Sequence, residues 1–266
     1  MSPQNRVQKL FSASPRNLLS VFYTAGYPTL NDTVVIAQAL EAAGADIIEI
    51  GIPFSDPVAD GPVIQESNHI ALGNGMNLPL LLDQVREIRK TVRLPIVLMG
   101  YLNPVLQYGV EKFCRDAAAA GVDGLILPDM PLEEYEMEYK AIVQQNGLCN
   151  TFLISPTTSI DRIRHIDALT NGFIYAVSSS STTGARGSFS QDQLAYFERL
   201  RSSKLTNPFL IGFGISDAAT FSVASSYGAG AIVGSAFISM LKQAGDLPAG
   251  IHQFVGQIRK GSPPVV

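Results

Sequence analysis

The chain has 266 residues, of which 46% are hydrophobic and 16% charged, so it can bury a large core and lacks the composition of a disordered protein. Its formal net charge of −4 at pH 7 provides no basic surface for nucleic acid or for an anionic membrane. No hydrophobic run reaches the roughly 18 residues of a membrane span, and the first residues lack the apolar region of a signal peptide. We therefore expect a cytoplasmic protein whose two cysteines, Cys114 and Cys149, are reduced packing residues.

The first elements of the chain set a pattern that later segments repeat. A short helix over residues 7–14 is expected before an apolar, β-branched strand over residues 18–24. The next helix is closed by Gly44, and a second apolar strand over residues 46–50 follows at once. The same order of helix end, glycine and buried strand returns at two later points, Gly121 and Gly228.

Eight such strands, each followed by a helix, account for almost the whole chain. The expected strands cover residues 18–24, 46–50, 95–101, 124–128, 150–155, 173–178, 209–213 and 231–234. The expected helices cover residues 31–43, 63–72, 78–92, 110–120, 132–145, 160–169, 191–201, 217–226, 236–243 and 251–260. The strands are apolar along nearly their full length, as parallel strands buried on both faces are.

This pattern predicts an α/β fold of the (β/α)8 or TIM-barrel class, with a short N-terminal helix and extra helices. We expect one domain over residues 1–266, because no linker divides the chain. A doubly wound open sheet is the alternative, but no GxGxxG follows the first strand and nothing marks an edge strand.

Active sites of such barrels lie at the carboxyl ends of the strands, in the loops that follow. No lysine is expected there, and the three histidines, His69, His165 and His252, fall in helical stretches. No group of residues has metal-ligand spacing. We therefore expect neither a metal site, nor a lysine Schiff base, nor a Ser-His-Asp triad.

Two carboxylates do occur at the end of the second strand. Glu49 lies inside the apolar sequence IIEIG, where burial would raise its pKa into the range of a general acid or base. A structural ion pair is the alternative, but no Lys or Arg is expected at the end of a strand. Asp60 could cap the next helix instead, but Pro62 suits the first helical position, which makes Gly61 the N-cap and leaves Asp60 outside. Turn or surface roles suit the two other acids near strand ends, Asp56 and Asp129.

Glycines follow the last two strands, at Gly214 and at Gly234-Ser235. Backbone N–H groups in such loops, with the dipole of the helix that begins there, predict a phosphate site. Tight turns alone are the alternative. The small, polar loop over residues 179–189 has the composition of a mobile lid, with a solvated loop as the alternative, and Tyr175 in the strand before it could line the cavity.

The sequence IEIGIPFSDPVADGPVIQ, which contains both Glu49 and Asp60, closely resembles the signature of the tryptophan synthase alpha chain family. The resemblance extends over nearly the whole chain through Thr24-Ala25-Gly26, residues 127–134, Ser155-Pro156-Thr157, Thr183-Gly184 and Gly212-Phe213-Gly214-Ile215. It implies a carbon–carbon lyase of tryptophan biosynthesis, which cleaves indole-3-glycerol phosphate by a retro-aldol step to indole and glyceraldehyde 3-phosphate.

The resemblance also implies roles for single residues. Glu49 would protonate C3 of the indole ring and assist the glycerol hydroxyl, and Asp60 would stabilise the positive charge that develops at the indole nitrogen. The cavity and the phosphate site would be formed by Phe22, Tyr175, Thr183, Gly184, Phe213, Gly214, Gly234 and Ser235.

A partner is implied as well, because the family's alpha chain docks on a beta chain in an α2β2 assembly and passes indole to it. Pyridoxal phosphate would belong to that beta chain, and no cofactor is expected in this one. The partner-facing surface would include Asp56, Pro57, Asn103 and Pro104.

Two loops depart from the family pattern. Ser181-Thr182 stand where the lid usually has Gly-Val, and Tyr27 stands where the first loop usually has Asp. Both loops bear on lid closure and on communication with the partner. Two alternatives stay open: another phosphosugar enzyme on the same barrel, such as an isomerase, and a non-catalytic subunit that mainly activates its partner.

Overall fold

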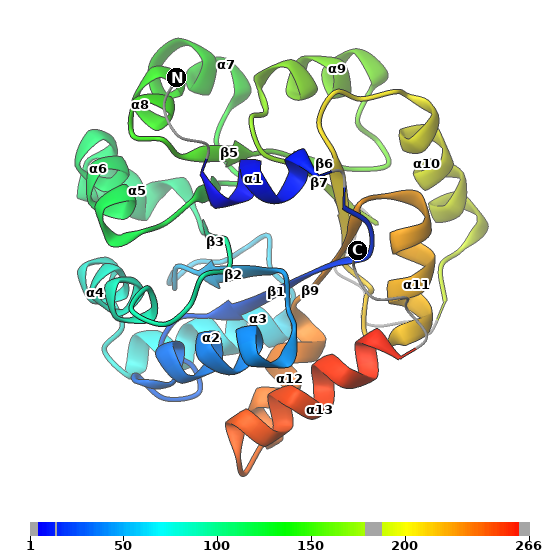
Figure 1. The fold of residues 1–266 in the computed structure, drawn as a ribbon. Coiled ribbons are helices and arrows are strands. Elements are labelled where there is room, and N and C mark those ends of the chain that lie inside the picture. The colour runs from blue at the N-terminus through cyan, green and yellow to red at the C-terminus, as the bar shows by residue number, and fades with distance from the viewer. Residues whose placement is uncertain (1–4, 14, 179–187, 261–266) are drawn as a thin grey trace.

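Parallel β-strands form a ring at the centre of the molecule, and helices surround it (Figure 1). The computed structural model describes residues 5–13, 15–178 and 188–260. Within these residues the strands are β1 (Leu18–Thr24), β2 (Ile47–Gly51), β3 (Ile96–Met99), β4 (Gly124–Ile126), β5 (Cys149–Thr151), β6 (Leu153–Ile154), β7 (Ile174–Val177), β8 (Phe209–Gly212) and β9 (Gly230–Val233).

The strand order is β5-β4-β3-β2-β1-β9-β8-β7-β6, and each neighbouring pair is parallel. Its two ends, β5 and β6, are separated along the chain by Phe152 alone. They are therefore two parts of the predicted fifth strand, and the ring closes through the chain itself. The predicted TIM barrel is confirmed, with one of its eight strands broken in two.

The helical segments lie between and around these strands. They are α1 (Arg6–Ser12), α2 (Asp32–Ala43), α3 (Pro62–Gly73), α4 (Leu78–Ile88), α5 (Leu102–Tyr108), α6 (Val110–Ala120), α7 (Leu132–Glu134), the π-helical η1 (Tyr135–Tyr139), α8 (Lys140–Gln145), α9 (Ile160–Leu169), α10 (Gln191–Ser202), α11 (Ala218–Tyr227), α12 (Ser235–Gln243) and α13 (Leu247–Arg259). None of the described helices is long and apolar enough to cross a membrane.

Besides the broken fifth strand, several helices differ from the predicted ones. Helix α5, which we expected to be a loop, follows β3. The single helix expected over residues 132–145 is divided by the π-helical turn η1. The helix expected over residues 78–92 ends at Ile88, and the turns after it continue to the next strand.

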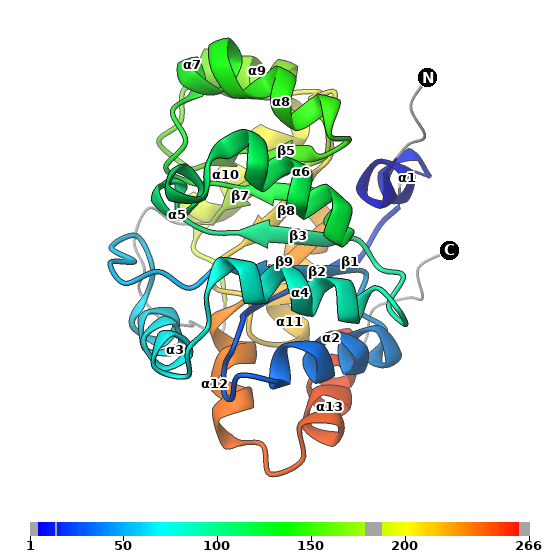
Figure 2. The same cartoon turned by 90° about the vertical axis from the view of Figure 1, so that its left-hand side faces the viewer.

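Helix α1 lies across one end of the barrel, on the side opposite α3 (Figure 2). The Asn5 side chain, which also caps α1, donates hydrogen bonds to the carbonyls of Asp123 and Gly147 at 2.8 and 2.9 Å. Arg6 forms an ion pair with Asp123 at 3.1 Å. Val7 is fully buried among side chains of the barrel interior. The short first helix therefore covers the amino end of the barrel, which leaves the carboxyl end for the site.

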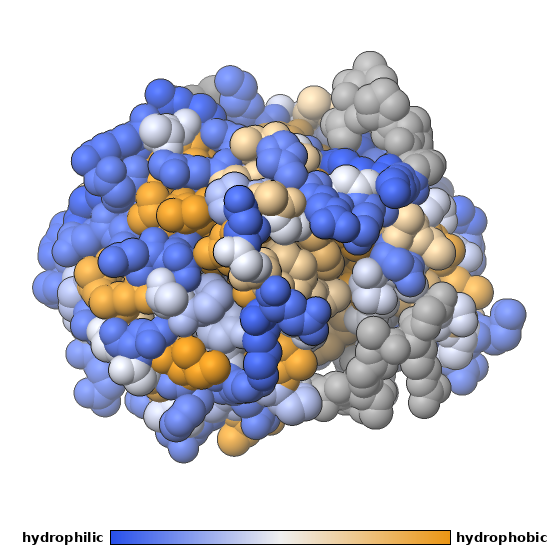
Figure 3. Space-filling model, turned by 90° about the horizontal axis from the view of Figure 1, so that it is seen from below, coloured by the Kyte–Doolittle hydropathy of each residue, from blue (hydrophilic) through white to orange (hydrophobic). Residues whose placement is uncertain are grey.

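The core has two parts, because successive side chains of a strand point to opposite faces. One buried cluster fills the barrel interior and includes Leu18, Ile47, Val97, Tyr175 and Leu210. The larger cluster lies between the strands and the surrounding helices. On the outer surface that carries α12 and α13, hydrophilic residues dominate, and hydrophobic residues appear in separate groups and in a paler area near the middle (Figure 3).

Candidate active site

Glu49 lies inside the barrel on β2. Its side chain is 0% exposed, and the register pairs it with Phe22 on β1 and Val97 on β3. The Ser20 hydroxyl donates a hydrogen bond to Oε1 at 2.6 Å, and Oε2 has no hydrogen-bond partner among the described residues. Burial raises the pKa of Glu49 to about 7, although the Ser20 hydrogen bond lowers it. A carboxyl group with this pKa can donate or accept a proton near neutral pH.

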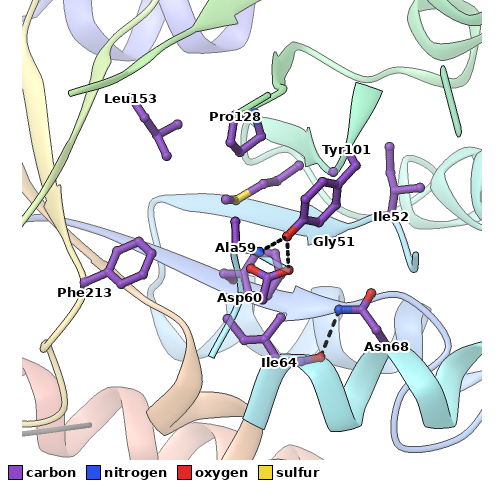
Figure 4. Close-up of a pocket in the computed structure, with 13 residues that line it drawn as sticks. Gly51, Ile52, Ala59, Asp60, Ile64, Asn68, Tyr101, Pro128, Leu153 and Phe213 are labelled. Atoms are coloured by element: carbon purple, nitrogen blue, oxygen red, sulfur yellow. Dashed lines mark hydrogen bonds between the residues drawn. The ribbon is translucent and has the colours of Figure 1, made fainter. Parts of the chain in front are cut away.

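Asp60 lies in the loop between β2 and α3 and is held by Tyr101. The Tyr101 hydroxyl donates to Oδ2 of Asp60 at 3.1 Å and accepts the N–H of Ala59 at 3.0 Å (Figure 4). Burial raises the pKa of Asp60 to about 6, and the hydrogen bond from Tyr101 opposes that rise. As expected, Gly61 is the N-cap of α3 and Pro62 its first residue, so the Asp60 carboxylate is not used as the cap.

A cavity opens between these elements at the carboxyl end of the barrel (Figure 4). Counted out to its open mouth, it measures about 510 Å³. Its lining is mostly apolar and comprises Phe22, Gly51, Ile52, Ala59, Asp60, Ile64, Asn68, Met99, Gly100, Tyr101, Pro128, Leu153 and Phe213. An apolar cavity with a few polar groups suits a largely apolar small-molecule ligand whose orientation those polar groups fix.

Glu49 is not among the lining residues and lies deeper in the barrel. Ser20, its hydrogen-bond partner, pairs with Ile47, one layer nearer the amino end than Phe22. The carboxyl group of Glu49 is therefore turned down into the barrel, below the cavity floor at Gly51.

Tyr175 on β7 is not among the residues that line the cavity, but it packs against Phe213, which is. Its ring meets that of Phe213 edge to face, with centroids 6.2 Å apart. Burial, with the negative charges of Glu49 and Asp60, raises its pKa. Tyr175 is therefore close enough to both acids for their charges to act on it, which is consistent with one site that contains all three side chains.

Two glycines make room for these rings. A Cβ atom on Gly212 would lie 2.6 Å from Cζ of Tyr175, and one on Gly51 would lie 2.7 Å from Cζ of Phe22. Real Cβ atoms do not approach other heavy atoms so closely. The positions of both rings therefore depend on the absence of a side chain at the neighbouring strand.

The loops after β8 and β9 come together as expected, because these strands are neighbours. Phe213 and Gly214 adopt positive φ angles of 68° and 75°, which is uncommon for a bulky residue. The Ser178 hydroxyl holds this turn by donating to the Phe213 carbonyl at 2.7 Å. Gly234 is the N-cap of α12 and Ser235 its first residue, and no side chain caps this helix. The N–H groups that begin α12 therefore suit an anion.

Two residues of the expected partner surface, Asp56 and Pro57, lie on the β2–α3 loop, where Asp56 is exposed. The neighbouring Val58 is 86% exposed. The other two, Asn103 and Pro104, are in the first turn of α5 and not in a loop. A proline fits there because the first turn of a helix leaves its N–H groups unpaired.

Asp129 has a structural role that differs from the expected turn. Its Oδ1 accepts the N–H of Leu102, the first residue of α5, at 2.9 Å. The loop after β4 therefore fixes the start of a helix that follows β3. The expected lid residues Thr183 and Gly184, with Ser181 and Thr182, lie outside the described residues.

Sequence reasoning missed Tyr101 and Asn68. Asn68 on α3 accepts the N–H of Phe54 at 3.0 Å and donates to the Ile64 carbonyl at 2.9 Å, which ties the loop to the helix. Tyr101 was the last residue of the strand predicted over residues 95–101, so its place at a carboxyl end was a usable signal. No sequence signal pointed to Asn68, because the path of the β2–α3 loop brings its hydrogen-bond partner Phe54 to it. Across the described part of the chain, no group of His, Cys, Asp and Glu could hold a metal ion.

Comparisons with known proteins agree with this geometry. A family model described as tryptophan synthase alpha chain matches residues 9–258. The chain is 54% identical over 256 residues to a tryptophan synthase alpha chain of Flavobacterium johnsoniae, which covers 96% of this chain and 100% of that one. It is 55% identical over 238 residues to that of Parabacteroides distasonis, covering 90% and 93%.

Solved structures show the same similarity. The tryptophan synthase subunit alpha from Legionella pneumophila superposes with a TM-score of 0.87 at 34% identity, covering 97% of this chain and 98% of that one. A structure of Mycobacterium tuberculosis tryptophan synthase gives 0.86 at 33% identity, with the same coverage. The chain belongs to the tryptophan synthase alpha chain family.

Proposed function

We propose that the cavity at the carboxyl end of the barrel is where this chain cleaves its substrate, and that Glu49 and Asp60 carry out the reaction. The reaction is that of the family, the cleavage of indole-3-glycerol phosphate in tryptophan biosynthesis, which makes the chain a carbon–carbon lyase. The observation that supports this site most directly is a pair of carboxyl groups, one lining an apolar cavity and one beneath it, with pKa values raised to about 6 and about 7.

The two acids suit the two charges that the reaction moves. Protonated Glu49 donates its proton to C3 of the indole ring, and positive charge develops at the ring nitrogen. The carboxylate of Asp60 accepts a hydrogen bond from that N–H and stabilises the charge. The glycerol hydroxyl then returns a proton to the Glu49 carboxylate as the carbon–carbon bond breaks, and the bonding electrons restore the aromatic ring. Glu49 ends the cycle protonated, as it began.

Glu49 must turn toward the cavity for this chemistry. In the structure its Oε1 accepts from Ser20, below the cavity floor, and Oε2 has no partner among the described residues. We infer that the side chain leaves Ser20 and rises to the level of Gly51 when substrate is bound. One hydrogen bond from a hydroxyl group is a small barrier to that rotation.

The rest of the ligand is held at the opposite wall. Phe22 and Phe213, which line the cavity, supply aromatic surfaces for the indole ring, and Tyr175 packs against Phe213. The N–H groups of Gly214, Gly234 and Ser235 supply the phosphate site, supported by the uncapped start of α12. By the family resemblance, Thr183 and Gly184 would complete it.

We also propose that the chain works with a tryptophan synthase beta chain that carries pyridoxal phosphate, in an α2β2 assembly. The partner-facing surface would contain Asp56 and Pro57 on the β2–α3 loop and Asn103 and Pro104 on α5. The Asp56 and Val58 side chains are exposed, so this loop is accessible to a partner.

The test is indole release from indole-3-glycerol phosphate by Glu49→Gln and Asp60→Asn, with Glu138→Gln on the outer surface as the matched control. Loss of the acid or base is expected to lower the rate by about 10²–10⁴-fold, while the control keeps full activity. Substantial turnover by folded Glu49→Gln would overturn the assignment.

Two further comparisons address the alternatives. Binding of indolepropanol phosphate and not of a plain sugar phosphate argues against an isomerase. Turnover by the isolated chain, measured with and without a beta chain, separates an enzyme from a subunit that only activates its partner.

A further inference from the structure

Tyr101 occupies a junction between the proposed active site and the proposed partner surface. It is the last residue before α5 and forms the N-cap of that helix. Its hydroxyl is used twice, as a donor to Asp60 and as an acceptor from the backbone of Ala59. Both groups belong to the β2–α3 loop, so one hydroxyl group joins this loop to α5 (Figure 4).

The ring of Tyr101 is fixed as well as its hydroxyl. It packs on Phe54 of the same loop, with centroids 5.0 Å apart. The helix that begins after it is held by Asp129, which accepts the N–H of Leu102 at 2.9 Å. The Tyr101 hydroxyl therefore reaches Asp60 from a position that packing and a helix cap both define, which is how a supporting side chain orients a reactive one.

We propose that Tyr101 is a positioning residue for the reaction, whose hydroxyl holds the Asp60 carboxylate toward the cavity and couples its position to the β2–α3 loop and to α5. The inference rests on the proposed role of Asp60. It adds a side chain that neither donates nor accepts the reacting proton but sets where the stabilising charge lies. A displacement of the β2–α3 loop or of α5 would therefore move Asp60, because the Tyr101 hydroxyl links Asp60 to both.

Besides burial, the group that shifts the pKa of Asp60 is the hydroxyl of Tyr101, which precedes α5. The other titratable groups around this pair are Glu49 on β2, Tyr175 on β7 and Asp129 after β4. Of these, only the Tyr101 hydroxyl donates a hydrogen bond to Asp60 among the described residues. That bond lowers the pKa of Asp60, so its removal raises a pKa that is already about 6.

The variant Tyr101→Phe tests the proposal because it keeps the ring on Phe54 and removes only the hydroxyl. Since Asp60 acts on charge that develops in the transition state, kcat is expected to fall about tenfold while KM changes little. The acidic limb of the dependence of kcat on pH is expected to shift to higher pH by about one unit, because a larger fraction of Asp60 is protonated at a given pH.

The control is Tyr108→Phe on the same helix. Tyr108 also donates its hydroxyl to an aspartate, Asp116, at 2.9 Å, but away from the cavity. This variant is expected to keep both kcat and the position of the acidic limb. The position of the limb does not depend on the fraction of folded protein, so it stays informative if Tyr101→Phe lowers the yield.

Two outcomes separate this inference from the proposed function. If Asp60→Asn loses activity but Tyr101→Phe matches the Tyr108→Phe control in kcat and in the acidic limb, the positioning role is wrong and the role of Asp60 stands. If Asp60→Asn retains turnover, the role of Asp60 itself is wrong, and the role of Tyr101 is overturned with it.

Discussion

Replacement of Glu49 by Gln is expected to remove activity and to raise the stability of the variant, relative to the unsubstituted protein, as the pH rises. The unperturbed pKa of a glutamate side chain is 4.5, and burial raises that of Glu49 to about 7. Between these values the folded protein keeps a proton that the unfolded chain has lost. Folding then takes up a proton, so the contribution of Glu49 to stability is present below pH 4.5 and is lost as pH rises to about 7.

The size of the effect follows from the rise in pKa. A difference of one pH unit corresponds to 1.36 kcal/mol, so a rise from 4.5 to about 7 corresponds to about 3 kcal/mol. The full value applies because the side chain is 0% exposed. In Glu49→Gln, the amide nitrogen takes the position of Oε2, where no hydrogen-bond partner lies among the described residues. This costs free energy at every pH, so the change of the difference with pH is the quantity to measure.

The assay is urea unfolding of both proteins at several pH values between 4.5 and 8.5. The free energy of unfolding of Glu49→Gln, minus that of the unsubstituted protein, should increase by about 3 kcal/mol across this range. Glu138→Gln, at an exposed position, should show no comparable increase. A difference for Glu49→Gln that stays constant from pH 4.5 to 8.5 would refute the reasoning, because it would mean that Glu49 titrates alike in the folded and unfolded chains.

Two further substitutions test the packing around the site. Gly212→Ala should displace the Tyr175 ring, lower the free energy of unfolding by about 1–3 kcal/mol and reduce kcat/KM for indole release; unchanged values in both assays would show that the ring has another place to go. Asp129→Ala should remove the cap of α5 and lower the free energy of unfolding by about 1 kcal/mol in urea titrations, whereas an equally stable variant would mean that the Leu102 N–H finds another acceptor.

The barrel could be predicted from the sequence because the strands are apolar along nearly their full length and three of them follow a helix end and a glycine. The position of Asp60 relative to α3 could also be predicted, since Pro62 is a strong local signal for a first helical residue. Both predictions depend on residues that are close together in the chain.

The features that escaped prediction depend on distant parts of the chain. Helix α5 has only seven residues with Pro104 in its first turn, and its cap comes from Asp129 in another loop. The break at Phe152 is not marked by a turn residue in the sequence. Tyr101 lies at the end of a predicted strand, but its contact with Asp60 depends on how the β2–α3 loop folds.

The ladder of paired strands is continuous from β5 through β1 and β9 to β6, and among the described residues it breaks at Phe152. Both proposed catalytic acids, and the tyrosine that holds one of them, come from the half of the chain that contains β1 to β5. The aromatic residues Tyr175 and Phe213 and the glycine loops of the proposed phosphate site come from the half that contains β6 to β9. A ligand that fills the site would contact both halves of the chain and join them across the barrel. Substrate binding would then add rigidity to the whole ring as well as order to the site.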